Sequence, residues 1–374
     1  MNRQEFKALC VRPVCSLRDA LQRLNATARG VLLVQGDDGV LLRTVTDGDL
    51  RRARLQHMGD GTLVASLPAQ TPITVNEAAG AAAVLAVMDK HQIDHVPVLN
   101  ASGCAVDVVF RRELPRCVTL VNLYGQCADM DALLPVCARD GVPVLENAAE
   151  SFGGSYKGRS GGTFGREGVY SFKGNKIITT SGGGMLVADD ADLVARAREL
   201  STPARDPAPH HQHSEMGFNY RMGNVLAGIG RGQLRVLDQR VAQRRRVFER
   251  YRQVLTDRPD IQWTTKPPGF QSTRWLTCLP LSRPTARQRC AAVIQRLERH
   301  SIEARPVCNP MHLQPLFFGA PHFNDALGED GLGGLFQHGL CLPSGFNTSE
   351  DQQDRVIMHL RRALVQSESL HATT

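Results

Sequence analysis

Apolar and polar residues in the first part of the chain follow a pattern that predicts a helix and then a β-hairpin. Four apolar positions recur at the spacing of one helix face: Leu17, Ala20, Leu21 and Leu24. Two apolar runs follow at residues 31–34 and 40–45, and the sequence GDDG between them tolerates a tight turn. We therefore expect a helix that packs against two antiparallel strands.

The same pattern occurs a second time. Residues 95–114 align with residues 31–50, so that Val98 corresponds to Val34 and Gly103 to Gly39. Ahead of this second hairpin, Ala81, Leu85 and Met88 predict another helix, and residues 95–99 and 105–110 predict its strands. Residues 1–115 thus form an internal duplication, and we expect the two copies to bury each other's apolar faces in one domain.

From residue 118 the pattern becomes strand, loop, helix and strand. Asp129 is a candidate N-cap, and the apolar face of the helix is predicted from Met130, Leu133, Leu134 and Cys137. Gly141 ends the helix, and residues 142–145 form a short apolar strand of the kind found in parallel sheets. This order predicts a doubly wound α/β domain, in which Glu146, Asn147 and Glu150 follow a strand and face a ligand crevice.

A second strand, residues 168–172, leads to Ser171 and to two lysines, Lys173 and Lys176. Three glycines, residues 182–184, permit a close approach of the backbone before another strand at Met185. The phosphate-binding pattern G-x-x-x-x-G-K-[ST] does not occur in this segment. Further on, Val247, Tyr251 and Leu255 recur at helical spacing, and we expect the arginines around them to form a solvated helix face.

Composition narrows the functional classes. The chain has 374 residues, a formal net charge of +7 and only 5% aromatic residues, so a nucleic-acid-binding module is not predicted. Its 10 cysteines include no C-x-x-C pair, and we expect no metal site. No apolar stretch is long enough to span a bilayer, and no secretory signal opens the sequence, so we expect a cytoplasmic protein that does not bind membranes.

The duplicated first domain resembles a CBS domain pair, and TVTDGDLRR is similar to CBS pairs attached to sugar nucleotidyltransferases. In such pairs a T-x-x-D pattern after the last strand holds the ribose of an adenosyl nucleotide. Thr46 and Asp49 match it in the first copy, whereas Phe110 and Glu113 stand at the corresponding places of the second. The resemblance implies at most one adenosyl-nucleotide site. The alternative is an empty structural pair in which Asp49 caps a helix or pairs with Arg51 or Arg52.

Residues 118–374 resemble the DegT/DnrJ/EryC1/StrS family of sugar aminotransferases, which depend on pyridoxal 5'-phosphate (PLP). The resemblance rests on SF-x-GNKIITT-x-GGGM, GFNYRMGNVLAGIGRGQL, RPVCNPMHLQP and GLCLPSG. It implies a fold-type I aminotransferase with a large PLP-binding domain, residues 116–238, and a C-terminal α+β domain, residues 239–374.

The resemblance also implies roles for individual residues. Lys176 corresponds to the lysine that forms the Schiff base with PLP, because a primary amine is needed to condense with the cofactor aldehyde. Ser171 corresponds to the serine that binds the PLP phosphate, and Asn219 to an asparagine that reaches the cofactor of a partner subunit in a homodimer. Asn147 stands where the family has the aspartate that pairs with the pyridine nitrogen.

Two departures from the family pattern leave two functions open. Neutral Asn147 cannot stabilise a protonated pyridine ring as an aspartate does. In addition, CBS-like sequence replaces the family's front section, which supplies a phosphate-binding turn, a ring that stacks on PLP and the first strands of the sheet, so the large-domain sheet is expected to be partial. The first reading is an aminotransferase that acts on a keto sugar nucleotide with L-glutamate as donor. The alternative is a catalytically dead remnant that carries an adenosyl-nucleotide-binding CBS module.

Overall fold

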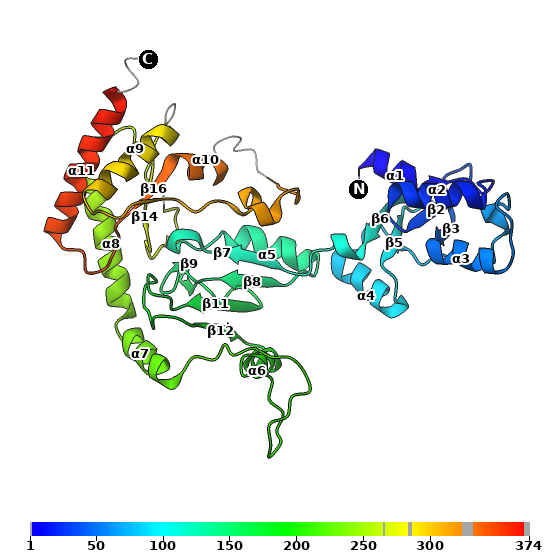
Figure 1. Ribbon diagram of the computed structural model, residues 1–374, viewed down its shortest axis with the longest axis horizontal. Helices are drawn as coiled ribbons and strands as arrows, with labels where there is room; N and C mark the ends of the chain where they lie inside the picture. The colour runs from blue at the N-terminus through cyan, green and yellow to red at the C-terminus, as the bar shows by residue number, and fades with distance from the viewer. Residues whose placement is uncertain (1, 265, 283–285, 324–331, 370–374) are drawn as a thin grey trace. The chain divides into compact units, whose positions relative to one another are not determined.

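The structure is a computed structural model that describes residues 2–264, 266–282, 286–323 and 332–369. The chain divides into two compact units (Figure 1). Unit 1 contains Met1–Val118 and Pro135–Pro143, and unit 2 contains Thr119–Leu134 and Val144–Thr374. Within the described residues no helix combines the length and the apolar character needed to cross a bilayer.

Unit 1 is built from two similar three-stranded sheets, ordered β1-β2-β3 and β4-β5-β6. In each sheet a short parallel strand pairs with an antiparallel hairpin, and an irregularity in register interrupts the hairpin at its last pair. The elements are α1 (Arg3–Leu9), β1 (Cys10–Val11), α2 (Leu17–Thr27), β2 (Val31–Gln35), β3 (Leu41–Thr46), α3 (Asp47–Leu55), β4 (Val75–Asn76), α4 (Ala81–His91), β5 (His95–Leu99) and β6 (Ala105–Phe110).

The predicted duplication is confirmed in its helices and strands, and β5 and β6 have the predicted bounds. The predicted helix faces were only partly right. Leu17, Ala20 and Leu24 are buried in α2, but Leu21 is exposed. In α4 the buried residues are Val84 and Met88, whereas Ala81 and Leu85 are only half-buried. The buried face of α4 is therefore rotated about the helix axis relative to the predicted face. Alanines occur on several sides of this helix, so the sequence specifies only weakly which side packs on the sheet.

Unit 2 contains a four-stranded sheet in the order β12-β11-β8-β7 (Figure 1). β8 and β11 are parallel, and β12 runs antiparallel to β11. Helix α5 (Met130–Arg139) begins in unit 2, and its residues from Pro135 onward belong to unit 1. The other elements of this part are β7 (Val118–Val121), β8 (Val144–Asn147), β9 (Ser155–Tyr156), β10 (Arg159–Ser160), β11 (Glu167–Ser171), β12 (Gly184–Ala188), α6 (Ala191–Leu200) and α7 (Asn224–Leu234). β8 begins at Val144 rather than at the predicted residue 142.

Helix α5 differs from its predicted packing. Asp129 caps it as expected, because its Oδ1 accepts a hydrogen bond from the Ala132 N–H at 3.3 Å. Met130 is fully buried, but Leu133 is exposed, and Leu134 and Cys137 are only half-buried. The apolar face is present in the sequence, but the described residues of this chain cover only its first turn. The prediction that all four residues are buried was therefore wrong.

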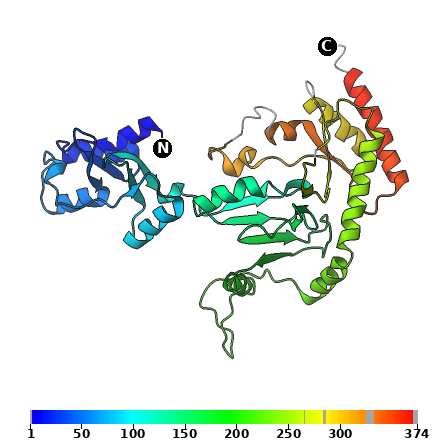
Figure 2. The same cartoon turned by 180° about the vertical axis from the view of Figure 1, so that it is seen from behind.

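The last part of unit 2 is an antiparallel sheet, ordered β14-β16-β15, with helices packed beside it (Figure 2). Its elements are α8 (Leu237–Val254), β13 (Phe270–Gln271), β14 (Thr277–Pro280), α9 (Ala286–Arg299), β15 (Arg305–Pro306), α10 (Leu332–His338), β16 (Gly339–Leu342) and α11 (Glu350–Ser369). Val247, Tyr251 and Leu255 are buried as predicted. Arg244 is also buried, so the expectation that the arginines of α8 form a solvated face was wrong for this residue.

Candidate active site

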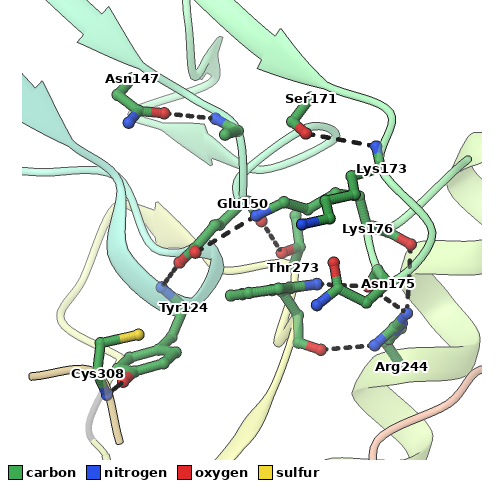
Figure 3. Close-up of polar contacts among 12 residues, drawn as sticks. Tyr124, Asn147, Glu150, Ser171, Lys173, Asn175, Lys176, Arg244, Thr273 and Cys308 are labelled. Atoms are coloured by element: carbon green, nitrogen blue, oxygen red, sulfur yellow. Dashed lines mark hydrogen bonds and ion pairs between the residues drawn. The ribbon is translucent and has the colours of Figure 1, made fainter. Parts of the chain in front are cut away.

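Two neighbouring parallel strands end side by side and bring the predicted residues together (Figure 3). β8 ends at Asn147, which is in register with Val169, and β11 ends two residues later at Ser171. Glu150 lies in the turn after β8, and Lys176 lies in the turn after β11. The carboxyl ends of parallel strands are where open α/β sheets bind ligands, so the fold places an amine, an amide and a hydroxyl at such an edge.

The side chain of Lys176 is mostly buried. Its Nζ lies 3.4 Å from Glu150 Oε1, and the two side chains are 13% and 15% exposed. The same Nζ lies over the ring of Trp275, 4.0 Å from the ring centroid. A carboxylate and the face of an indole therefore hold the amine from two sides, since both attract a cation.

Glu150 is held in place by residues distant in sequence. Its Oε2 accepts a hydrogen bond from the Tyr124 N–H at 2.8 Å, and its main-chain oxygen accepts one from Thr273 Oγ1 at 3.1 Å. Tyr124 has a left-handed backbone with φ 53°, and its hydroxyl accepts a hydrogen bond from the Cys308 N–H at 2.6 Å. Burial raises the pKa of Tyr124 above its ordinary value, so this hydroxyl stays protonated.

Asn147 and Ser171 each use one atom in a local hydrogen bond. Asn147 Oδ1 accepts from the Ala149 N–H at 3.1 Å, which leaves the amide NH2 as the group that can bind a ligand. Ser171 Oγ accepts from the Lys173 N–H at 3.4 Å, so its O–H can be donated elsewhere. The polar edge formed by these two side chains thus presents hydrogen-bond donors.

Asn219 is not part of this cluster. It lies exposed in the loop between α6 and α7, where the rings of Phe218 and Tyr220 on either side of it stack 5.0 Å apart. In the part of the chain that the structure describes, Asn219 makes no hydrogen bond to Lys176, Ser171 or Asn147. Its predicted role toward a partner subunit stays a prediction.

Asn122 directly precedes the segment LYGQ and forms hydrogen bonds inside the fold. Its Nδ2 donates to Glu146 Oε1 at 2.7 Å and to Ser151 Oγ at 3.0 Å, and all three residues are buried. Glu146 also accepts from the Phe164 N–H at 2.9 Å. Glu146 was predicted to face the ligand crevice. This prediction was wrong, because the carboxylate is buried and both of its oxygens accept hydrogen bonds from within the fold.

Sequence reasoning missed four residues that surround Lys176: Tyr124, Arg244, Thr273 and Trp275. Tyr124 belongs to the segment LYGQ, to which the sequence analysis assigned no role. Arg244 precedes Val247 and Tyr251 by helical spacing, and this was the signal that it shares their buried face. Thr273 and Trp275 carried no local signal, because only the tertiary fold brings the segment between β13 and β14 beside the lysine turn.

In unit 1, Thr46 and Asp49 form a capping box at the start of α3. Thr46 Oγ1 donates to Asp49 Oδ2 at 2.7 Å, and Asp49 pairs with Arg52 at 2.6 Å. Both residues line a cavity of about 190 Å³ together with His95 of the second copy. At the corresponding place of the second copy, Phe110 is buried in an apolar cluster that includes Leu9 of α1.

Comparison with known proteins shows the family of the chain. Residues 78–361 match the sequence pattern of the DegT/DnrJ/EryC1/StrS aminotransferase family. The chain belongs to this family. The match begins at residue 78, inside unit 1 and ahead of residue 118, where the resemblance starts in the sequence.

Individual members of the family are similar over the same part of the chain. EpsN of Bacillus subtilis, named as a pyridoxal phosphate-dependent aminotransferase, is 49% identical over 244 residues, which are 65% of this chain and 62% of EpsN. GDP-perosamine synthase of Caulobacter vibrioides is 38% identical over 252 residues, 66% of this chain and 65% of that protein. The structure of DesV of S. venezuelae is similar with a TM-score of 0.57 and 27% identity, covering 67% of this chain and 65% of DesV. The chain thus spans less than two thirds of the length of each of these relatives.

Proposed function

We propose that this chain binds PLP covalently through Lys176 and acts as an aminotransferase on a keto sugar nucleotide, with L-glutamate as the amino donor. The observation that carries this proposal is the mostly buried Lys176 amine, held between Glu150 and Trp275 beside two strand ends. The name of a similar protein supports the substrate class, since a GDP-perosamine synthase is 38% identical over 252 residues.

The residues at the strand ends fit PLP by their chemistry. An amine, a hydroxyl and an amide NH2 come from Lys176, Ser171 and Asn147, and these groups suit an aldehyde, a phosphate oxygen and a pyridine nitrogen. When bound, PLP supplies an aldehyde for the amine and a ring that accepts electron density from the substrate carbon. The fit is incomplete, because the family's phosphate-binding turn and stacking ring come from the replaced front section.

The chain's own residues orient the amine, transfer a proton and exclude water. Glu150 accepts a hydrogen bond from Lys176 Nζ and thereby orients the amine. Lys176 Nζ can take up and return a proton when it is not covalently engaged. The Trp275 ring covers one side of the same nitrogen and excludes water there.

We further propose a homodimer, supported by the exposed aromatic rings of Phe218 and Tyr220 beside Asn219.

Covalent trapping tests the proposed attachment. The full chain is incubated with PLP and reduced with borohydride, and the modified peptide is then mapped. We expect the label on Lys176, its loss in Lys176→Ala and its retention in Lys173→Ala. Lys173 is the matched control because it lies in the same turn but is exposed. A label on Lys173, or none in the unmodified chain, would contradict the proposal.

A second candidate function is binding of an adenosyl nucleotide by unit 1. It is supported by the cavity of about 190 Å³ that Thr46 and Asp49 line, and by the apolar filling of the corresponding place around Phe110. We propose one site per chain. A ribose there would compete with Arg52 and Thr46 for the Asp49 carboxylate.

Calorimetric titration of the full chain with AMP measures the affinity of this site for the nucleotide. We expect Asp49→Ala to weaken binding by about tenfold, because a hydrogen bond to a charged group is lost. Asp47→Ala is the control, since Asp47 lies on the same helix turn and pairs with Arg51 outside the cavity lining. Equal affinity in the Asp49 and Asp47 variants would place the nucleotide elsewhere.

A further inference from the structure

Arg244 of α8 lies beneath the lysine turn and binds it through the main chain (Figure 3). Its Nη1 donates to the main-chain oxygen of Trp275 at 2.7 Å. Its Nη2 donates to the oxygens of Asn175 and Lys176, both at 3.3 Å. These last two carbonyls belong to the peptide groups on either side of the Lys176 Cα, so one guanidinium nitrogen contacts both.

The indole of Trp275 strengthens the same arrangement. Its Nε1 donates to the Asn175 oxygen at 2.7 Å, while its ring lies under the Lys176 Nζ. Arg244 holds Trp275 by its carbonyl and Trp275 holds Asn175 by its indole. The backbone before Lys176 is therefore fixed from two directions, and the ring beside its amine is fixed by the same arginine.

Arg244 has no anionic partner among the described residues. It is 6% exposed, and its Nε is buried without a hydrogen bond. Burial alone lowers the pKa of Arg244 to about 10, and no carboxylate offsets this effect. The group is still charged at neutral pH. A buried cation without a counter-ion is costly, so a long apolar side chain of similar volume would be the more stable choice if packing were the only requirement.

We propose that Arg244 is a positioning residue that fixes the peptide groups flanking Lys176 and so aims its amine at Glu150 and Trp275. This inference rests on the proposed attachment of PLP to Lys176. The planar guanidinium suits the task because its diverging N–H groups reach three carbonyls at once. A lysine at this position has a single ammonium and cannot bridge all three.

The test compares Arg244→Met and Arg244→Lys with Arg246→Met in the full chain. Arg246 is exposed on the same helix and serves as the control. Without PLP, hydrogen exchange is followed for the turn amides of Lys176 and Thr180, which bond to Lys173 and Phe172. With PLP, the equilibrium of covalent attachment and the visible circular dichroism of the bound cofactor are measured.

We expect Arg244→Met to accelerate exchange of the turn amides by about tenfold and to weaken PLP attachment by about tenfold, because charged hydrogen bonds are lost. Arg244→Lys should give intermediate values with altered dichroism, and Arg246→Met should match the unmodified chain. Arg244→Lys decides the question if Arg244→Met does not fold. Unchanged turn exchange in a folded Arg244 variant, or an equal acceleration throughout unit 2, would overturn the inference. If the unmodified chain attaches no PLP, the proposed function fails, and the exchange measurement still decides the role of Arg244.

Discussion

Leu360→Ala is expected to destabilise unit 2 by about 2–5 kcal/mol, because truncation of a buried leucine leaves a cavity that its neighbours fill only partly. Leu360 lies on α11 and is fully buried. The same core cluster contains Tyr251 of α8, Leu297 of α9 and Leu340 of β16, all fully buried. Three helices and the central strand of the antiparallel sheet therefore share one apolar core, from which this substitution removes a fully buried side chain.

Urea unfolding followed by far-ultraviolet circular dichroism measures this loss, with the transition of unit 2 identified by the fluorescence of its two tryptophans, Trp263 and Trp275. Met358→Ala is the matched control, since Met358 lies on the same helix and is 40% exposed. We expect its effect to be within about 1 kcal/mol. Equal destabilisation by the two substitutions would show that the α11 core is not packed as described.

Local patterns predicted the elements of unit 1 well, for a physical reason. Residues 95–99 and 105–110 are short β-prone runs bounded by turn residues, and the structure gives β5 and β6 the same bounds. The exposure of Leu133 could not be predicted in this way. An apolar residue on a helix is buried only if another element covers it, and the pattern along α5 does not record whether that element is present.

The residues of the candidate site were likewise predictable from the sequence only in part. Lys176 and Ser171 could be chosen from sequence because they occur in a segment typical of one family, and Asn147 because it follows a predicted strand of an α/β domain. The structure brings the three residues to neighbouring strand ends. Trp275 and Tyr124 lie far from Lys176 along the chain, so their contact with the lysine turn depends on the completed fold. Arg244 was misassigned because the charge of an arginine run suggests solvent, whereas main-chain carbonyls can satisfy a buried guanidinium without any acidic partner.

Asn147 sets the limit on catalysis that we expect for the isolated chain. Its Oδ1 is engaged by the Ala149 N–H, so the atom it can offer to a pyridine nitrogen is an N–H donor. A donor pairs with an unprotonated ring nitrogen, whereas electron acceptance by the ring is strongest when that nitrogen is protonated and balanced by a carboxylate. If Asn147 faces the ring nitrogen as proposed, the chain would favour the less reactive form of the cofactor.

We accordingly expect the PLP-loaded chain to convert L-glutamate very slowly, with pyridoxamine phosphate as the measured product. Ser171 is the one residue at the described strand ends that we propose as a phosphate contact, and a reacting group misplaced by about 1 Å can cost about a hundredfold in rate. Asn147→Asp supplies the missing charge but not the phosphate contacts. It should accelerate the half-reaction only when another chain provides the front section that we expect to be replaced here. Asn347→Asp, which adds the same charge in an exposed turn before α11, is the control and should have no effect. Rapid stoichiometric conversion by the unmodified chain would show that Asn147 and the replaced front section do not limit the reaction.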